Sequence, residues 1–333
     1  MHVTDSPVFV SGEAARSVFR WADAIDALRV AYATNSSPKA TPPRSIAADG
    51  SAWLRVLPSM PSSGRYFGAK LMGSPGTTTP PRVEYVIVLF DRQTGSIAAF
   101  VDGNVITGLR TAATSAVALD RLAPGRPLHV AVLGSGFEAT MHIRAVASIR
   151  ELSNVTVFSP TPNRRAAFAA VVTDELGVPA EAAQTPEEAT KCADVVIAAA
   201  RSRGEAPIVY GQWLAPGAVV LSIGSTVPQQ REIDASVVDR ADLIVCDVLD
   251  EVLDGTGDMI AATASGIEFR HKAVSLTDVL TGACDQRLDA AHNLMYKSVG
   301  SGLQDIVVAE LVLTQALRAG LATELPIAFE TKD

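Results

Sequence analysis

The sequence predicts an α/β protein with two parts, a mostly antiparallel sheet region and a doubly wound parallel sheet. The length of 333 residues fits two domains. From His129 onward, continuous apolar runs alternate with helical stretches, as parallel strands buried on both faces require. Before His129 the strand-like runs are short and separated by turn signals, which is typical of antiparallel strands.

The first part of the chain is expected to begin with an amphipathic helix and to continue as short strands. From Trp21 to Tyr32, apolar residues recur at helical spacing opposite charged ones. Residues 35–43 are rich in Ser and Pro and predict a loop. The strands predicted for the antiparallel sheet are Ala52–Leu57, Tyr66–Leu71, Val83–Phe90 and Ile97–Val101. A turn is predicted at Asp91–Gly95, and helical periodicity returns over Thr111–Leu122.

The second part is expected to supply the parallel sheet. Its predicted strands are His129–Leu133, Val155–Phe158, Val195–Ala199, Val219–Ile223 and Leu243–Asp247. One of the helices between them should start at Thr185, with Pro186 in its first turn and Glu188 closing a capping box. A last helix is predicted over Gly302–Ala319.

Composition excludes several classes of function. The formal net charge is −8, and no run of Lys or Arg offsets it, so nucleic acid is not an expected partner. No stretch approaches the roughly 18 apolar residues of a membrane span, and the N-terminus carries no export signal. Cys192, Cys246 and Cys284 lie far apart, and the five histidines are scattered, so we expect buried thiols and no metal. A cytoplasmic protein that binds a small metabolite fits best.

A glycine motif at the start of the second part predicts a dinucleotide-binding turn. Gly134, Gly136 and Ala139 form a GxGxxA pattern at the end of one strand and the start of a helix. Gly134 permits a tight turn, Gly136 lets the backbone approach a pyrophosphate, and Ala139 allows close helix packing. The N–H groups of the helix start are then available to phosphates, so Ser135, Phe137 and Glu138 join the predicted cofactor site. A merely structural glycine turn is the alternative.

The end of the second parallel strand favours NADP over NAD. An acidic residue there would bind the adenosine ribose hydroxyls, but the sequence has none. It instead offers Ser159, Thr161, Arg164 and Arg165, whose cations suit a 2′-phosphate. NAD stays possible, because the two arginines could simply solvate the first turn of the following helix.

A longer constellation resembles a known family. The run Asp102–Ala113 (DGNVITGLRTAA), followed by the glycine-rich strand, resembles the ornithine cyclodeaminase/mu-crystallin family. The similarity covers nearly the whole chain. Its supporting pieces are Pro43–Arg44, Gly68–Lys70, Val88–Asp91 before Gly95, Arg231–Asp234, Lys297–Gly300 and Gln304–Asp305.

The resemblance implies a fold organisation and a set of roles. It implies a homodimer whose substrate-binding and dimerisation domain comprises residues 1–120 and 300–333, with the NAD(P)-binding Rossmann domain, residues 121–299, inserted. The positions of Arg44 and Lys70 would bind the substrate carboxylate, and that of Arg110 would lie near it beside the nicotinamide. The remaining expected contacts are Val299 for the substrate and Arg110, Thr111, Ser222, Ile223, Gly224 and Ser298 for the cofactor.

Three positions depart from the family pattern. Cyclodeaminases carry a catalytic aspartate where this sequence has Thr226, which can hold a water but cannot titrate near neutral pH. Reductase members resemble the sequence better in lacking that aspartate. Arg82 replaces the usual Ser or Thr. It could contact a second acidic group of the substrate, or it could be a solvated loop cation. Glu138 replaces a frequent Gln.

The sequence therefore predicts hydride transfer between NADP(H) and the α-carbon of a small imino or amino acid. Arg44, Lys70 and Arg110 would hold the carboxylate, and Lys70 would keep the imine protonated, directly or through a water on Thr226. Two alternatives stay open. One is an NAD-dependent lyase of the ornithine cyclodeaminase type that releases ammonia. The other is a non-enzymatic, NADPH-dependent ligand binder like mu-crystallin.

Overall fold

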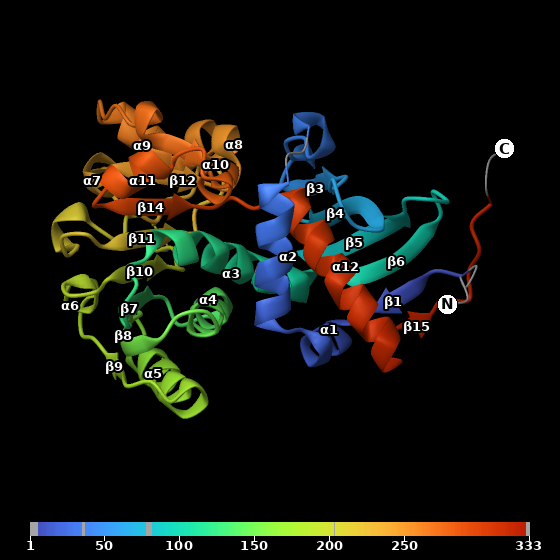
Figure 1. Cartoon of the computed structure of the whole chain (residues 1–333), viewed down its shortest axis with the longest axis horizontal. Coiled ribbons are helices and arrows are strands. Elements are labelled where there is room, and N and C mark those ends of the chain that lie inside the picture. Colours follow the sequence, from blue (N-terminus) through green and yellow to red (C-terminus); the bar gives the residue numbers. More distant parts are fainter. Residues whose placement is uncertain (1–5, 35–36, 78–81, 203, 331–333) are drawn as a thin grey trace. The chain divides into compact units, whose positions relative to one another are not determined.

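The computed structural model describes residues 6–34, 37–77, 82–202 and 204–330. The chain divides into two compact units: unit 1 comprises Met1–Arg110 and Ser301–Asp333, and unit 2 comprises Thr111–Gly300. Unit 1 is thus assembled from both ends of the chain, and in Figure 1 its blue N-terminal helix and red C-terminal helix lie side by side. Across the described ranges, no helix has the length and apolar character needed to span a bilayer.

Within the residues described, unit 1 forms a seven-stranded sheet in the order β15-β1-β6-β5-β4-β3-β2. All neighbouring strands run antiparallel except β1 and β6, which confirms the predicted mostly antiparallel sheet. The strands are β1 (Val8–Val10), β2 (Ser45–Asp49), β3 (Ala52–Ser59), β4 (Tyr66–Ser74), β5 (Glu84–Asp91), β6 (Ile97–Asp102) and β15 (Thr323–Glu324). The sequence did not predict β1, β2 or β15, because β1 and β15 are very short and every residue of β2 is exposed.

The faces of this sheet differ in burial. Along β4, residues alternate strictly between buried and half-buried, and Lys70 falls on the buried face beside Leu57 and Ile87 of the adjoining strands. Helices α1 (Gly12–Val18), α2 (Trp21–Ala33) and α12 (Gly302–Ala319) pack together, and α12 crosses β3 to β6. A lysine on this face is therefore placed in the interior of unit 1.

Two expectations for this part of the chain need adjustment. Helix α3 spans Gly103–Leu122, so it begins eight residues before the predicted Thr111. The Asp102 carboxylate accepts a hydrogen bond from the N–H of Asn104 (2.9 Å) and so starts the helix at a point where the sequence carries no apolar periodicity. The predicted loop contains one 3₁₀ turn, Pro38–Ala40, while residues 35–36 lie outside the described ranges.

Unit 2 forms, over its described residues, an eight-stranded sheet in the order β13-β12-β14-β11-β10-β7-β8-β9, with every pair parallel. The strands are β7 (Leu128–Leu133), β8 (Leu152–Phe158), β9 (Ala180–Ala182), β10 (Val195–Ala198), β11 (Val219–Ser222), β12 (Leu243–Cys246), β13 (Ala273–Ser275) and β14 (Leu294–Lys297). The five predicted strands are confirmed. The chain order reverses between β7 and β10, so this is a Rossmann fold with its switch point there.

Helices connect the parallel strands of unit 2. They are α4 (Phe137–Ala147), α5 (Pro162–Leu176), α6 (Pro186–Thr190), α7 (Ala235–Arg240), α8 (Leu249–Gly255), α9 (Gly257–Ala264), α10 (Leu276–Thr281) and α11 (Asp285–Ala290). Thr185 is the N-cap of α6, as predicted, and its hydroxyl accepts from the N–H of Glu188. The predicted capping box is wrong, because the Glu188 carboxylate accepts instead from the N–H of Gln184, one residue before the cap.

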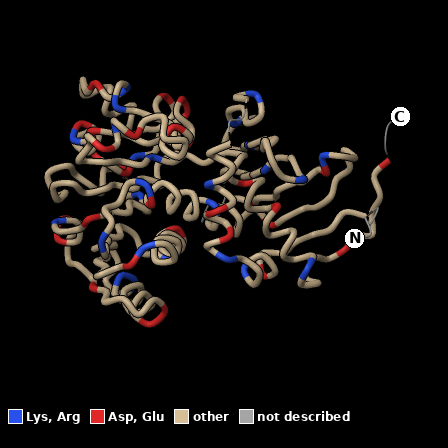
Figure 2. The backbone as a smooth tube through the Cα atoms, in the orientation of Figure 1, with Lys and Arg blue, Asp and Glu red and all other residues tan. Residues whose placement is uncertain are grey.

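Charged residues are mixed by sign across the fold. Figure 2 shows Lys and Arg positions interspersed with Asp and Glu positions along both units. The three cysteines are free; Cys246 and Cys284 are buried, and burial raises the pKa of both thiols. Cys192 is exposed, so the prediction of three buried thiols is wrong for it, because it lies in the turn between α6 and β10.

Candidate active site

Unit 1 contains a buried cluster of charged side chains centred on Asp305. The Lys70 Nζ lies 2.9 Å from both carboxylate oxygens of Asp305, and the Arg110 Nε donates to the same carboxylate at 2.9 Å. The exposed fractions are 1% for Lys70, 5% for Arg110 and 0% for Asp305. Two predicted substrate ligands are thereby brought together by a carboxylate that the sequence analysis did not assign.

Polar residues from neighbouring helices complete this cluster. The Arg110 guanidinium donates to Gln304 Oε1 at 2.5 Å, and Gln304 Nε2 donates to the Tyr32 hydroxyl at 2.7 Å. Lys70 also lies 3.4 Å from the hydroxyl of Thr107. Gln304 and Asp305 are fully buried in an otherwise apolar stretch of α12. In the sequence, a polar pair among apolar helix residues is the signal that could have indicated a site here.

The cluster carries an excess of positive charge. Burial lowers the pKa of Lys70 to about 8; the Asp305 carboxylate opposes this shift, while Arg110 and Arg44 add to it. Arg44, which immediately precedes β2 and is half-buried, therefore acts on the same ammonium group. Three cations therefore act at one place in unit 1, and this concentration of positive charge suits an anionic ligand.

Arg82 does not join this group of buried cations. Its guanidinium donates to Glu84 at 2.9 Å, and the two side chains are 74% and 73% exposed. This geometry favours the solvated loop cation over a contact to a second acidic group of the substrate.

In unit 2, the glycine turn has the geometry that its sequence predicts. Gly134 adopts a φ of +127°, and a Cβ there would lie 2.9 Å from the carbonyl oxygen of Ala199. Gly136 is the N-cap of α4, and a Cβ there would meet nothing within 4 Å. Ala139 is fully buried against the sheet. Gly134 is required by packing, whereas Gly136 faces open space.

The first turn of α4 fits a bound diphosphate. The N-cap Gly136 has no side chain that could occupy the N–H groups of this turn. Phe137 is 50% exposed and the Glu138 side chain 40% exposed, so the helix start lies at the surface of unit 2. The turn lies at the carboxyl end of β7, beside the switch point of the sheet, where open parallel sheets bind nucleotides.

The arginines that follow β8 have different environments. The Arg165 guanidinium is buried, donating to the carbonyl of Ser159 at 3.0 Å and to Gln184 at 2.8 Å, so it does not solvate the helix start. Arg164 and Thr161 are exposed, and the Ser159 hydroxyl accepts from Ser135 at 2.9 Å. Of the two arginines predicted to meet a 2′-phosphate, only Arg164 is thus exposed.

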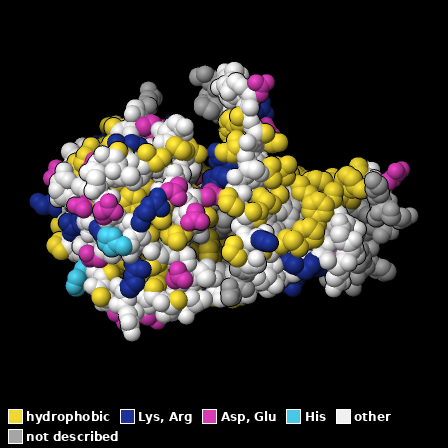
Figure 3. Space-filling view, turned by 90° about the horizontal axis from the view of Figure 1, so that it is seen from above, with side chains coloured by type: hydrophobic (Ala, Val, Ile, Leu, Met, Phe, Trp, Pro, Cys, Tyr) yellow, Lys and Arg dark blue, Asp and Glu magenta, His cyan; other side chains and the backbone are white. Residues whose placement is uncertain are grey.

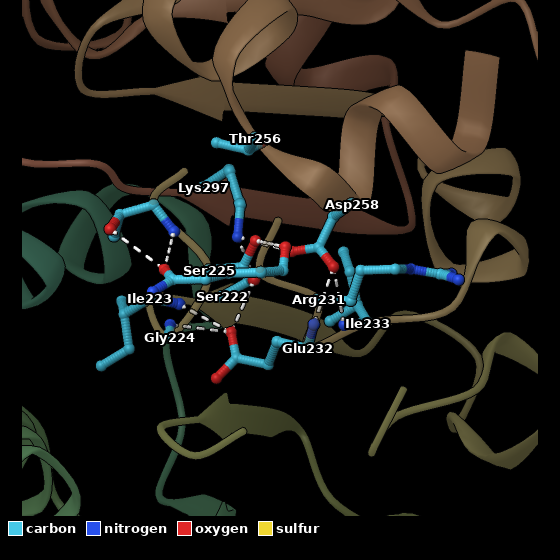
Figure 4. A network of polar contacts seen from close by, with 12 residues as sticks. Ser222, Ile223, Gly224, Ser225, Arg231, Glu232, Ile233, Thr256, Asp258 and Lys297 are labelled. Carbon is cyan, nitrogen blue, oxygen red and sulfur yellow. Dashed lines mark hydrogen bonds and ion pairs between the residues drawn. The ribbon is translucent and has the colours of Figure 1, made fainter. Parts of the chain in front are cut away.

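The loop after β11 is held from below by Glu232 (Figure 4). The N–H groups of Ile223 and Gly224 and the hydroxyl of Ser222 all donate to this carboxylate, at 3.0, 2.9 and 2.8 Å. In these three predicted cofactor residues, the Ser222 hydroxyl and the N–H groups of Ile223 and Gly224 are therefore already paired with Glu232. Those hydrogen bonds fix the conformation of the loop. Thr226 follows, with its N–H and hydroxyl near Gln230 Oε1 (3.0 and 3.3 Å).

The remaining predicted residues lie at the ends of β14 and in α3. The Asp247 carboxylate accepts from the Ser298 hydroxyl at 2.7 Å and from the N–H of Val299 at 3.0 Å. Thr111 is half-buried in α3. No group of three or more His, Cys, Asp or Glu side chains suited to a metal ion occurs in the ranges that the structure describes.

Comparison with known proteins decides the family. The model of the ornithine cyclodeaminase/mu-crystallin family matches residues 8–320. The chain belongs to this family. Its resemblance at the level of motifs is therefore confirmed.

Several relatives are named as imine reductases, and a solved structure that is 27% identical is named as a probable ornithine cyclodeaminase, from Bordetella pertussis, with a TM-score of 0.83, covering 95% of this chain and 99% of that chain. The chain is 30% identical to the ketimine reductase mu-crystallin of Mus musculus over 78% of this chain and 79% of the relative. It is likewise 30% identical to the iminosuccinate reductase of Paracoccus denitrificans, covering 72% and 73%. The solved Δ1-pyrroline-2-carboxylate reductase of Thermococcus litoralis, in complex with NADH and L-proline, shares 26% identity at a TM-score of 0.87, covering 96% and 100%.

Proposed function

We propose that the protein is an NAD(P)H-dependent imine reductase, working on a small imino acid or, in reverse, an amino acid. The observation that carries the proposal is the buried cluster of Lys70, Arg110 and Asp305 with its excess positive charge. Membership of a family whose relatives reduce ketimines, iminosuccinate and pyrroline-2-carboxylate supports the same reaction class.

A substrate carboxylate is an anion that suits the positive charge of this cluster. Arg44 and Arg110 would bind it through charge-assisted hydrogen bonds, with Val299 contacting the body of the substrate. Arg44 and Arg110 lie in unit 1, residues 1–110 and 301–333, within the expected boundaries 1–120 and 300–333, whereas Val299 lies in unit 2.

Lys70 is proposed to donate the proton to the imine nitrogen and, in the reverse reaction, to accept it. With a pKa of about 8, its side chain is mostly an ammonium at neutral pH and can still lose its proton without a large cost. Asp305 keeps that pKa from falling further and holds the Nζ in one position. A protonated imine accepts hydride more readily, so orientation and protonation are the main tasks of the protein.

Unit 2 is proposed to bind the dinucleotide through Gly134, Gly136 and the first turn of α4. When bound, the dinucleotide supplies or accepts the hydride. Arg164, together with Thr161 and Ser159, favours NADP, while NAD stays an alternative because relatives include complexes with NADH and NAD⁺.

Thr226 argues against the lyase reaction. A cyclodeaminase needs a titratable group on the substrate amine, and a hydroxyl that lies 3.3 Å from a glutamine oxygen does not ionise near neutral pH. The described residues of the loop, Ser225 to Gln230, contain no carboxylate that could replace it.

Absorbance at 340 nm separates the candidate functions. We expect the purified protein to consume NADPH when it is given 1-pyrroline-2-carboxylate, and to show an α-amino-acid product. A lyase would release ammonia from ornithine while the absorbance stays flat, and a ligand carrier would bind NADPH without turnover. Either outcome would overturn the reductase proposal.

We further propose that unit 1 forms a homodimer through the uncovered face of its sheet. The half-buried residues of β4, β5 and β6 on that face are apolar except for Asp102 at the end of β6, and Phe67 stacks on Phe90 with ring centroids 5.5 Å apart. Hydrophobic side chains gather over unit 1 in Figure 3. An apolar sheet face of this kind is a usual interface between identical subunits.

Light scattering tests the dimer. The wild-type protein should have twice the mass of one chain, and Phe90→Glu should give monomers because it places a charge in the apolar face. Val171→Glu, on the exposed side of α5 in unit 2, is the control and should stay dimeric. A monomeric wild type would contradict the proposal.

A cytoplasmic location is also proposed, supported by three unpaired thiols.

A further inference from the structure

A second buried charged cluster lies in unit 2, outside the residues assigned above to catalysis. It consists of Glu232, Asp258 and Lys297, with exposed fractions of 0%, 1% and 0%. Lys297 Nζ donates to Asp258 at 2.8 Å and to the Ser222 hydroxyl at 2.8 Å (Figure 4). Asp258 in turn accepts from the backbone N–H groups of Glu232 and Ile233. The cluster therefore holds Glu232 at two points: Asp258 binds its backbone N–H, and Ser222, which contacts Lys297, binds its carboxylate.

The Glu232 carboxylate joins the carboxyl ends of two adjacent strands. Oε1 accepts from the N–H of Ala200, which follows β10, at 3.1 Å. Oε2 accepts from the Ser222 hydroxyl and from the N–H groups of Ile223 and Gly224 at the end of β11. Gly224 is required there, because a Cβ would lie 2.3 Å from Oε1. One side chain therefore sets the spacing of both loops.

The loop after β10 also touches the glycine-rich turn. A Cβ on Gly134 would meet Ala199 O at 2.9 Å and the Cβ of Ala200 at 3.2 Å, so the turn packs directly on the segment that Glu232 holds. A continuous set of contacts within unit 2 thus runs from Glu232 through Ala200 to the phosphate-binding turn. A displacement of Ala200 would therefore change the packing of the glycine-rich turn at Gly134.

All four groups around the Glu232 carboxylate donate hydrogen bonds to it. The Ser222 hydroxyl already accepts from Lys297, so it donates to Glu232. Protonation would neutralise the carboxylate, so all four hydrogen bonds would lose their charge assistance. The ionised form therefore holds the two loops more strongly than the neutral form.

We propose that ionised Glu232 is a positioning residue for dinucleotide binding, and that its protonation weakens the binding. This rests on the proposed function of unit 2. Burial raises the pKa of Glu232 to about 7; Asp258 of α9 adds to the rise, and Lys297 of β14 opposes it. If only the ionised form binds, the apparent Kd should rise about tenfold from pH 8 to pH 6.

The test is the Kd for NADH and for NADPH, measured by fluorescence between pH 6 and pH 9. NADH is the decisive probe, because the 2′-phosphate of NADPH itself loses charge near pH 6. We expect the tenfold rise with both. In Glu232→Gln the Kd should be weak and independent of pH, the KM for the dinucleotide should rise, and kcat at saturation should stay within about twofold. Glu187→Gln, an exposed glutamate in the same unit, should behave as wild type.

A second variant keeps the proposal testable if Glu232→Gln does not fold. Ser222→Ala removes a hydrogen bond that lowers the pKa of Glu232, so the midpoint of the NADH titration should move to higher pH. A wild-type Kd that is constant over the range, a pH dependence retained in Glu232→Gln, or an unmoved midpoint in Ser222→Ala would overturn the inference. Failure to bind either dinucleotide at pH 8 would instead overturn the proposed function.

Discussion

The two buried clusters of this protein have opposite charge balance. In unit 1, Lys70 and Arg110 share the carboxylate of Asp305, with Arg44 adding a further positive charge. In unit 2, Asp258 pairs with the ammonium of Lys297, which also acts through its charge on the carboxylate of Glu232. Both clusters are removed from water, so an imbalance in either must be compensated nearby.

The two clusters differ in the sign of their excess charge, and we propose that this difference separates a binding site from a support. The excess negative charge of unit 2 is met by the protein itself, through backbone N–H groups and a hydroxyl that donate to the two carboxylates. The excess positive charge of unit 1 is suited to a carboxylate that comes from outside. We therefore read unit 1 as holding the reacting substrate and the unit 2 cluster as holding loops.

The largest effect is expected from Lys70→Met, which removes the proposed proton donor of unit 1. We expect kcat for imine reduction to fall by about 10³-fold, because positioned acid–base groups contribute rates of that order. The Kd for NADPH should stay within about twofold, since the dinucleotide is assigned to unit 2. Lys39→Met, an exposed lysine of unit 1, is the control. An unchanged kcat would remove Lys70 from the mechanism.

Asp305→Asn should disrupt the unit 1 cluster by removing its negative charge. Two buried cations would lose their shared carboxylate, so we expect the free energy of unfolding to fall by about 3 kcal/mol in a denaturant titration. Asp26→Asn, which breaks an exposed ion pair with Arg29, should change it by less than about 1 kcal/mol. Equal effects of the two substitutions would mean that the buried pair has no special weight.

The pH dependence of reduction sharpens the comparison further. Lys70 must carry a proton to act on the imine, and its pKa of about 8 lies below the ordinary 10.5. Reductive kcat/KM should therefore be level below about pH 8 and fall about tenfold per pH unit above it, while amino-acid oxidation should rise up to the same pH. Asp305→Asn should move this limb to lower pH. Retention of the limb in Lys70→Arg would assign it to another group.

The smallest expected effect is on the choice of dinucleotide. Arg164→Ala should weaken NADPH binding by about fivefold, because the guanidinium is exposed and its contact with a 2′-phosphate is screened by water. NADH binding should be unchanged, as isothermal titration can show. Equal weakening of both dinucleotides would mean that Arg164 does not contact the 2′-phosphate.

The sequence predicted those features that depend on local pattern. Continuous apolar runs gave the five main strands of the parallel sheet, and the glycine spacing gave the turn at Gly134. Strand β14 was missed, although its four residues are all buried, because its short run lies among polar loop residues. Its place between β11 and β12 is a tertiary property that no local window contains.

Motifs marked all three residues of the unit 1 cluster, but they suggested roles only for Lys70 and Arg110. The role of Asp305 depends on α12 returning to the sheet of β4 from the far end of the chain. Glu232 had a motif but no assigned role, because its four donors come from segments that are separated in sequence. Arg165 could not be distinguished from Arg164 by sequence, since only burial separates them.

Recognition of a substrate carboxylate by the unit 1 cluster can be tested with the carboxylate itself. We would compare kcat/KM for 1-pyrroline-2-carboxylate with that for 1-pyrroline, the same ring without the carboxylate, at saturating NADPH. We expect a preference of at least about 100-fold for the carboxylate, from a buried charge pair contributing about 3 kcal/mol. Equal values for the two imines would contradict it.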